Sequence, residues 1–214
     1  MILIGMFDSP FVRRVAVSMQ LLGVAFEHRN WSVGKDFELI RQHNPLGQVP
    51  TLVLNDGEAL SESSAILDHI DQTVGMSRAL LPQSGAARRQ ALQVMALAVG
   101  AAEKGRAEIY ERVFRPADKW HQPWVDRCRL QMHAALAELN HHCAKRGSDP
   151  WLVGDGLTQA DITVTCAFTF LSEAQLLTFA SDSYHSLRKL VERCEALPEF
   201  KSTYVAWSAP ATGT

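Results

Sequence analysis

The spacing of the apolar residues changes near residue 76. This change restricts the possible folds of the chain more strongly than any other feature of the sequence. Before it, short apolar runs alternate with helical spacings, whereas the later part shows helical spacing over long stretches. Between the two parts, residues 77–87 contain proline, glycine and small polar residues, which is typical of a linker. The sequence therefore predicts two domains, residues 1–76 with strands and helices and residues 88–214 with helices alone.

The first domain is expected to be an α/β domain with the element order β-α-β-α-β-β-α. Strands are predicted at residues 2–5, 24–31, 51–54 and 58–60, and helices at residues 11–22, 35–43 and 61–71. The first two strands are linked through a helix, so we expect them to be parallel. The last two are joined by a tight turn at Asn55-Asp56-Gly57, so they must be antiparallel.

Helices are expected to form the whole second domain, as in an all-α bundle. Apolar residues recur at helical spacing over residues 92–110, 124–143 and 184–196. Thr158 precedes Asp161 by three positions, the spacing of a capping box at a helix start. The segment that follows, residues 162–171, is rich in β-branched residues that also suit a strand, but the start signal favours a helix.

Charge and composition exclude several classes of partner. The formal net charge is −2, and the lysines and arginines form no basic stripe. We therefore expect no nucleic acid and no anionic membrane surface as a partner. The N-terminus lacks a cationic start, and no apolar run is long enough to span a bilayer, so the sequence predicts a cytoplasmic protein.

The cysteines limit the thiol chemistry that the chain can perform. All four lie in the second half, without a CxxC pair: Cys128, Cys143, Cys166 and Cys194. Buried, reduced thiols are the expected state, and the scattered histidines show no spacing typical of a metal site. Any thiol chemistry in the first domain would therefore need a sulfur that the protein does not supply.

Ser9 and Pro10 stand where the first strand gives way to a helix. Serine is a favoured N-cap and proline a favoured first helical residue, so the pair predicts where the helix begins. Ser9 would then be a capping residue only. The same position also faces the positive end of a helix, where a hydroxyl could donate a hydrogen bond to a thiolate. The sequence leaves both roles open.

Two further motifs would suit the binding of a small peptide. In "NPLGQVP", Pro50 forces Val49 toward an extended conformation, which would expose the main chain of Val49 to another peptide, most fully across a cis bond. In "SESS", Glu62 lies beside the start of a helix, where it could bind an ammonium group while Ser63 binds a carboxylate. An α-amino acid head group has both charges. An ordinary loop proline and a simple helix cap remain the alternatives.

These motifs, "SPFVRR", "NPLGQVP" and "ESSAILDHID", resemble in order and spacing those of the glutathione S-transferase family, and "DGLTQADITV" extends the resemblance into the second domain. The resemblance implies a thioredoxin-like N-terminal domain with a cis proline at Pro50, an all-helical C-terminal domain and a homodimer. It implies glutathione as substrate or cofactor and Ser9 as the catalytic residue, while the spacing of the histidines and cysteines predicts no metal. Cysteine occurs neither at Ser9 nor at Val12, which disfavours glutaredoxin-like chemistry.

The resemblance also implies the residues that bind the two substrates. The residues implied to bind glutathione are Ser9, Phe11, Gln48, Val49, Pro50, Glu62 and Ser63. Those expected near the electrophile, by analogy of fold, are Phe7, Phe37, Arg106 and Tyr110. Lys35 and His43 could also meet the glycyl carboxylate of glutathione, although a solvated surface role suits each equally.

The function expected from the resemblance is that of a detoxifying glutathione transferase, which activates the glutathione thiolate for attack on an electrophilic small molecule. Two alternatives stay open. A glutathione-dependent isomerase would keep the same site, and a non-enzymatic interaction module would keep the same fold.

Overall fold

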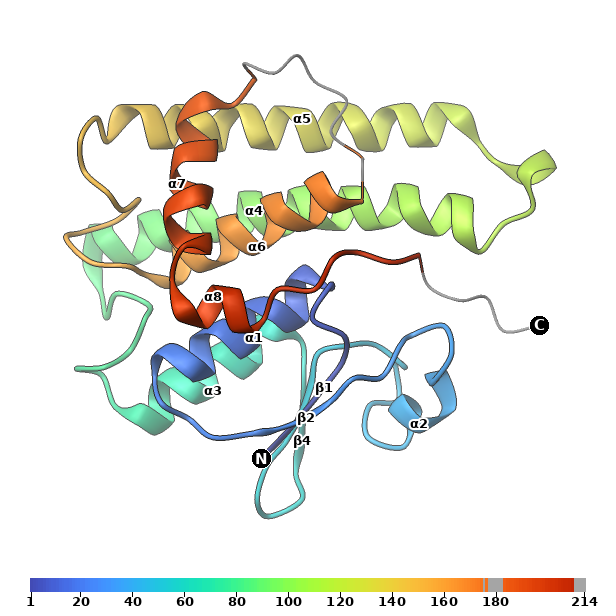
Figure 1. Cartoon of the computed structure of the whole chain (residues 1–214), viewed down its shortest axis with the longest axis horizontal. Coiled ribbons are helices and arrows are strands. Elements are labelled where there is room, and N and C mark those ends of the chain that lie inside the picture. The colour runs from blue at the N-terminus through green and yellow to red at the C-terminus, as the bar shows by residue number, and fades with distance from the viewer. Residues whose placement is uncertain (175, 177–182, 210–214) are drawn as a thin grey trace. The chain divides into compact units, whose positions relative to one another are not determined.

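The computed structural model describes residues 1–174, 176 and 183–209, and it divides the chain into two compact units (Figure 1). The first unit comprises Met1–Gln83 together with the segment that begins at Leu197. The second comprises Ser84–Ala196. The sequence alone assigns the last segment to the helical domain. In the structure it groups with the first unit instead, because Phe200 is fully buried there.

A four-stranded sheet forms the centre of the first unit. Its strands are β1 (Ile2–Ile4), β2 (Glu27–Arg29), β3 (Thr51–Val53) and β4 (Ala59–Ser61), in the order β2-β1-β3-β4. β1 is parallel to β2, while the pairs β1–β3 and β3–β4 are antiparallel. The predicted element order and both predicted strand orientations are confirmed, and the domain has the thioredoxin-like fold.

Helices cover both faces of this sheet, as their places in Figure 1 indicate. They are α1 (Pro10–Leu21), α2 (Phe37–Arg41) and α3 (Ser63–Val74). Successive residues of a strand point to opposite faces, so Leu3 joins the core against α1 and α3, whereas Ile4 packs with Ile40 of α2. The alternation along β1 thus sets the two sides of the sheet on which the helices lie.

Over its described residues, the second unit contains helices and connecting loops but no strand. Its helices are α4 (Gly85–Val113), the short 3₁₀ helix η1 (Ala117–Lys119), α5 (Gln122–Lys145), α6 (Gln159–Glu173) and α7 (His185–Glu195). The predicted capping box is present: Thr158 Oγ1 accepts from the Ala160 N–H, and Asp161 accepts from the Thr158 N–H at 2.8 Å. Residues 162–171, whose β-branched side chains also suit a strand, are therefore helical.

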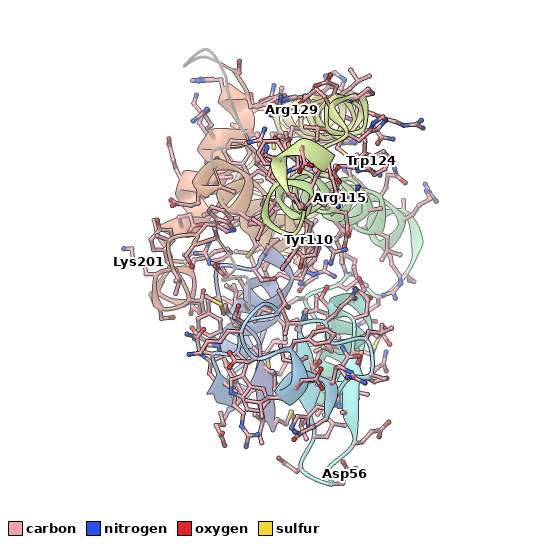
Figure 2. The ribbon with its side chains drawn as sticks, turned by 90° about the vertical axis from the view of Figure 1, so that its right-hand side faces the viewer. Asp56, Tyr110, Arg115, Trp124, Arg129 and Lys201 are labelled. Carbon is pink, nitrogen blue, oxygen red and sulfur yellow. The ribbon has the colours of Figure 1, made fainter. Side chains whose placement is uncertain are left out.

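An ion pair joins the two longest helices of this unit. Glu108 of α4 is almost fully buried, and both its oxygens accept hydrogen bonds from Arg129 of α5, the shortest at 2.7 Å. Arg129 is labelled in Figure 2. A buried carboxylate needs such a partner, because transferring its charge from water to the protein interior costs several kcal/mol of free energy unless a cation and hydrogen bonds compensate. Within the described part of the chain, no helix has both the length and the apolar character that crossing a membrane requires.

Two short helices fall outside the predicted elements. They are η1, and α8 (Pro198–Ser202), which belongs to the segment grouped with the first unit. Neither segment shows the helical spacing of apolar residues from which the longer helices were predicted.

Candidate functional site

Ser9 is the N-cap of α1, but its side chain makes no capping hydrogen bond. The main chain alone secures the helix start: the Ser9 N–H donates to the Met6 carbonyl at 3.2 Å, and the Ser9 carbonyl accepts from the Arg13 N–H at 2.9 Å. Pro10 is the first helical residue, as predicted, and needs no N–H partner. The capping role for the Ser9 hydroxyl is therefore wrong, and its half-buried side chain is left for another role.

Gly5 brings the end of β1, the first turns of α1 and the loop at Val49 into contact. Its φ is +131°, and a Cβ added there would lie 2.5 Å from Val12 Cγ2 and 2.8 Å from Val49 Cβ. A side chain fits neither the backbone conformation nor the space, so the position requires glycine. Close backbone approach at Gly5 thus places Val49 against the helix that begins at Pro10.

The Val49-Pro50 peptide bond is cis, which confirms the expectation from the resemblance. Hydrogen bonds on the preceding residue hold this loop: the Gln48 carbonyl accepts from the Asn44 side chain at 2.8 Å and from Thr51 Oγ1 at 3.1 Å. In the described part of the chain, the main-chain N–H and C=O of Val49 form no hydrogen bond. Both groups remain available to an added peptide strand.

Glu62 and the serines that follow it form the start of α3. Glu62 has a φ of +72°, which is uncommon for a residue other than glycine, and its side chain accepts from the Ser64 N–H at 3.0 Å. Ser63 Oγ donates to Glu62 Oε1 at 3.1 Å. Arg14 of α1 lies beneath them and donates to the hydroxyl oxygens of both serines. The glutamate carboxylate therefore lies beside the N-terminal end of a helix, and its side chain is 62% exposed.

The remaining residues predicted to bind glutathione differ in exposure. Phe11 is 8% exposed on α1 and belongs to the buried core, whereas Gln48 has an exposed side chain. Of the residues weighed for the glycyl carboxylate, Lys35 is exposed, and the ring centroid of His43 lies 6.0 Å from that of Trp31. The structure therefore brings together the loops that carry Ser9 and Val49, and it ties the helix after Ser9 to Ser63 through Arg14.

The residues predicted near the electrophile have packing roles. Phe7 stacks on His28 with a centroid distance of 3.8 Å, and the Phe37 ring fills the space in which Gly47 would carry a Cβ. Arg106 and Tyr110, of which Tyr110 is labelled in Figure 2, lie on α4 of the second unit. The Arg106 guanidinium lies 5.6 Å from the centroid of the Tyr110 ring. Burial raises the pKa of Tyr110 above 10.0, so its phenol stays protonated at neutral pH.

Sequence reasoning gave no binding or catalytic role to four residues that shape this site: Gly5, Asp8, Arg14 and Asn44. Asp8, next to Ser9, accepts a hydrogen bond from the Ser208 N–H at 3.3 Å. Burial raises the pKa of the Asp8 carboxyl, although hydrogen bonds from the main chain of Ser208 and Ser9 act the other way. Only Gly5 carried a local signal, since a glycine directly after a strand often marks a close approach of backbone.

The thiols of the chain itself are poor nucleophiles. Cys128, Cys166 and Cys194 are buried, and Cys143 is half-buried. Burial raises the pKa of both Cys143 and Cys194 to about 12, so these thiols are protonated at neutral pH. Over residues 1–174, 176 and 183–209, no cluster of three metal-ligating side chains occurs.

Comparison with known proteins identifies the family. Residues 3–78 match the N-terminal domain of glutathione S-transferases, and residues 122–197 match their C-terminal domain. The chain belongs to the glutathione S-transferase family. Both halves of this glutathione S-transferase family member thus match in the order that the sequence resemblance implied.

Relatives of this glutathione S-transferase family member span nearly its whole length. An uncharacterised GST-like protein of Escherichia coli, YibF, is 29% identical over 202 residues, which cover 94% of this chain and 96% of that protein. Among solved structures, a glutathione S-transferase of Methylobacterium radiotolerans with bound glutathione sulfonate is 27% identical, with a TM-score of 0.85 and coverage of 100% and 96%. That of Methylobacillus flagellatus with bound glutathione is 26% identical, with a TM-score of 0.84 and coverage of 98% and 99%.

Proposed function

We propose that this chain is a glutathione transferase that activates the thiolate of glutathione for attack on an electrophilic small molecule. The observation that carries the proposal is the Ser9 hydroxyl, which stands at the start of α1 and makes no capping bond. An ordinary thiol has a pKa of about 8.5 and is only a few per cent ionised at pH 7. A hydroxyl and a helix end that stabilise the anion would raise the concentration of the nucleophile.

The rest of glutathione would follow the surface described above. Its cysteinyl main chain would pair with Val49 beside the cis Pro50, and its γ-glutamyl ammonium and carboxylate would meet Glu62 and Ser63. Gln48 would meet the glycyl carboxylate, and Phe11 would line the site from α1. Two relatives with bound glutathione or its sulfonate support this choice of peptide.

Replacing Ser9 by alanine tests the proposal. The variant should lose about tenfold to a hundredfold in turnover, as expected for a lost hydrogen bond to a charged group, with a smaller change in glutathione affinity. Conjugation of a chlorinated dinitroarene, followed spectroscopically at several glutathione concentrations, separates the two effects. Ser84→Ala is the matched control, because Ser84 is also an N-cap without a side-chain capping bond. Unchanged turnover in Ser9→Ala would refute the assignment.

Phe7, Phe37, Arg106 and Tyr110 are each proposed as residues that contact the electrophile. A glutathione-dependent isomerase would use the same sulfur site, so an assay panel should include cis-dienoic acids and hydroperoxides beside arenes. A non-enzymatic interaction module is the third possibility. Retention on immobilised glutathione without activity toward any of these compounds would favour that module over the enzyme.

We further propose that the enzyme is a cytoplasmic homodimer that serves detoxification. Apolar side chains exposed on α4 and α5 support self-association, because large exposed apolar groups favour burial against a partner. They are Leu92, Trp124 and Leu130, of which Leu130 is 71% exposed. Light scattering after size-exclusion chromatography should give about twice the chain mass of 23.7 kDa, and a monomer at every concentration would contradict the proposal.

A further inference from the structure

Arg14 is a buried cation whose hydrogen bonds connect α1 to the first turn of α3. Its side chain is 1% exposed, and one nitrogen, Nη2, donates to Ser63 Oγ and to Ser64 Oγ, both at 2.7 Å. The same nitrogen lies 3.9 Å from Glu62 Oε1. Arg14 therefore contacts all three side chains at the start of α3.

The chemistry of the guanidinium decides how the two hydroxyl groups point. Arginine has donors and no acceptor, so each serine oxygen must accept from Arg14. The hydrogen of each hydroxyl then points away from Arg14. That of Ser63 points to Glu62 Oε1, at 3.1 Å, while the side chain of Ser64 is exposed. Among the described residues, no acceptor takes the hydrogen of Ser64.

The buried charge also strengthens these donors. A hydroxyl that accepts a hydrogen bond from a cation becomes a better donor, because hydrogen bonds in a chain polarise one another. The N–H groups at the start of α3 and the positive end of its dipole favour an anion at the same place. A carboxylate set before Ser64 would therefore meet its oriented hydroxyl hydrogen, while the hydroxyl hydrogen of Ser63 is directed at Glu62 Oε1.

We propose that Arg14 is a positioning residue for glutathione binding, and that the Ser64 hydroxyl, oriented by Arg14, donates to the α-carboxylate of the γ-glutamyl group at the start of α3, beside Ser63. The inference rests on the proposed function, since it concerns the same peptide. It assigns a binding role to Ser64 and a cause to the burial of Arg14. Neither residue contacts the sulfur in this arrangement, so both act on affinity and not on thiolate chemistry.

Calorimetric titration with two peptides tests the inference. One is glutathione, and the other carries γ-aminobutyryl in place of γ-glutamyl and so lacks the α-carboxylate alone. Ser64→Ala should weaken glutathione binding about tenfold, the cost of one hydrogen bond to a charged group, and Arg14→Met should weaken it more. Both variants should bind the second peptide within about twofold of the wild type. Turnover at saturating glutathione should stay within about twofold as well.

Further variants exclude a purely structural effect. Ser64→Thr keeps the hydroxyl and should restore affinity, while Thr73→Ala, which removes an exposed hydroxyl near the other end of α3, should change nothing. In a Ser64→Ala background, Arg14→Met should cost less than it does alone, because part of its effect passes through Ser64. If Arg14→Met fails to fold, the affinities of Ser64→Ala for the two peptides test the inference on their own.

The outcomes separate this inference from the proposed function. Wild-type protein that binds neither peptide overturns the proposed function. Wild-type binding of glutathione, with Ser64→Ala weakening both peptides equally or neither of them, overturns the role of Ser64 and Arg14 alone. A loss confined to the peptide that carries the α-carboxylate supports the inference.

Discussion

Asp8 shows how a residue beside the proposed sulfur site depends on a distant part of the chain. Its carboxyl is half-buried and accepts from the Ser208 N–H, 200 positions away in sequence. Burial raises its pKa above 3.8, so the fold disfavours the charged form. At pH values above the native pKa, ionised Asp8 therefore lowers the free energy of unfolding.

Replacing Asp8 by asparagine should remove this pH dependence. Because the native pKa is raised, the native state binds more protons than the unfolded state between 3.8 and the native value, and stability falls as pH rises through that interval. The stability of Asp8→Asn relative to the wild type should therefore rise as the pH increases from about 4 toward neutral. Thermal unfolding of both proteins across this range measures the difference, and a difference that falls with pH would contradict the expectation.

At the scale of elements, the contact of β1, α1 and the loop before β3 depends on a glycine, which has no side chain. Gly5 allows the backbone after β1 to approach Val12 and Val49 within distances that a Cβ would violate. Interiors are close-packed and do not yield readily, so a methyl group there must move the loop or the helix. The loop that would move carries the cis bond next to Val49.

Gly5→Ala should lower the free energy of unfolding by about 3 kcal/mol, because backbone strain and overpacking add. Gly57→Ala is the control: its φ is +94°, but no atom lies within 4 Å of the added Cβ, so it should lose only about 1 kcal/mol. Urea unfolding measures both variants. Glutathione affinity should fall in Gly5→Ala and stay constant in Gly57→Ala. Equal stability losses would show that steric contact at Gly5 does not matter.

At the scale of the whole molecule, the segment after Leu197 completes the first unit. Phe200 is fully buried, its carbonyl accepts from Arg13 Nη2 at 2.9 Å, and its ring lies 5.9 Å from the Arg13 guanidinium. The centroid of the Tyr204 ring lies 5.6 Å from the same guanidinium, but Tyr204 is 46% exposed. The two ends of the chain thus stabilise one unit.

Phe200→Ala should therefore destabilise α1, although Phe200 follows the helical domain in sequence. The expected loss is about 3–5 kcal/mol for a fully buried phenylalanine. Tyr204→Ala should lose about 1 kcal/mol or less, because much of its side chain is already in water. Hydrogen exchange should show protection lost in residues 10–21 of the Phe200→Ala variant. Unchanged protection there would mean that the segment does not support α1.

Local signals in the sequence predicted most of the fold and part of the site. The capping box at Thr158, the tight turn after β3 and the helix start at Pro10 each depend on residues only a few positions apart. The role of the Ser9 hydroxyl stayed open, because a serine before a proline fits a cap whether or not its side chain is used. The structure shows that the main chain alone holds the helix start.

The sequence by itself determined the order of strands and helices, the ends of several helices and the family motifs, because hydrophobic spacing and capping act between near neighbours. Only the tertiary structure decided which distant groups meet: Arg14 with Ser63, Gly5 with Val49, and Arg13 with Phe200. Apolar spacing shows which face of an element is buried, but it does not name the partner of that face. Partners are selected when the chain packs, since steric fit and hydrogen bonding then act on residues far apart in sequence.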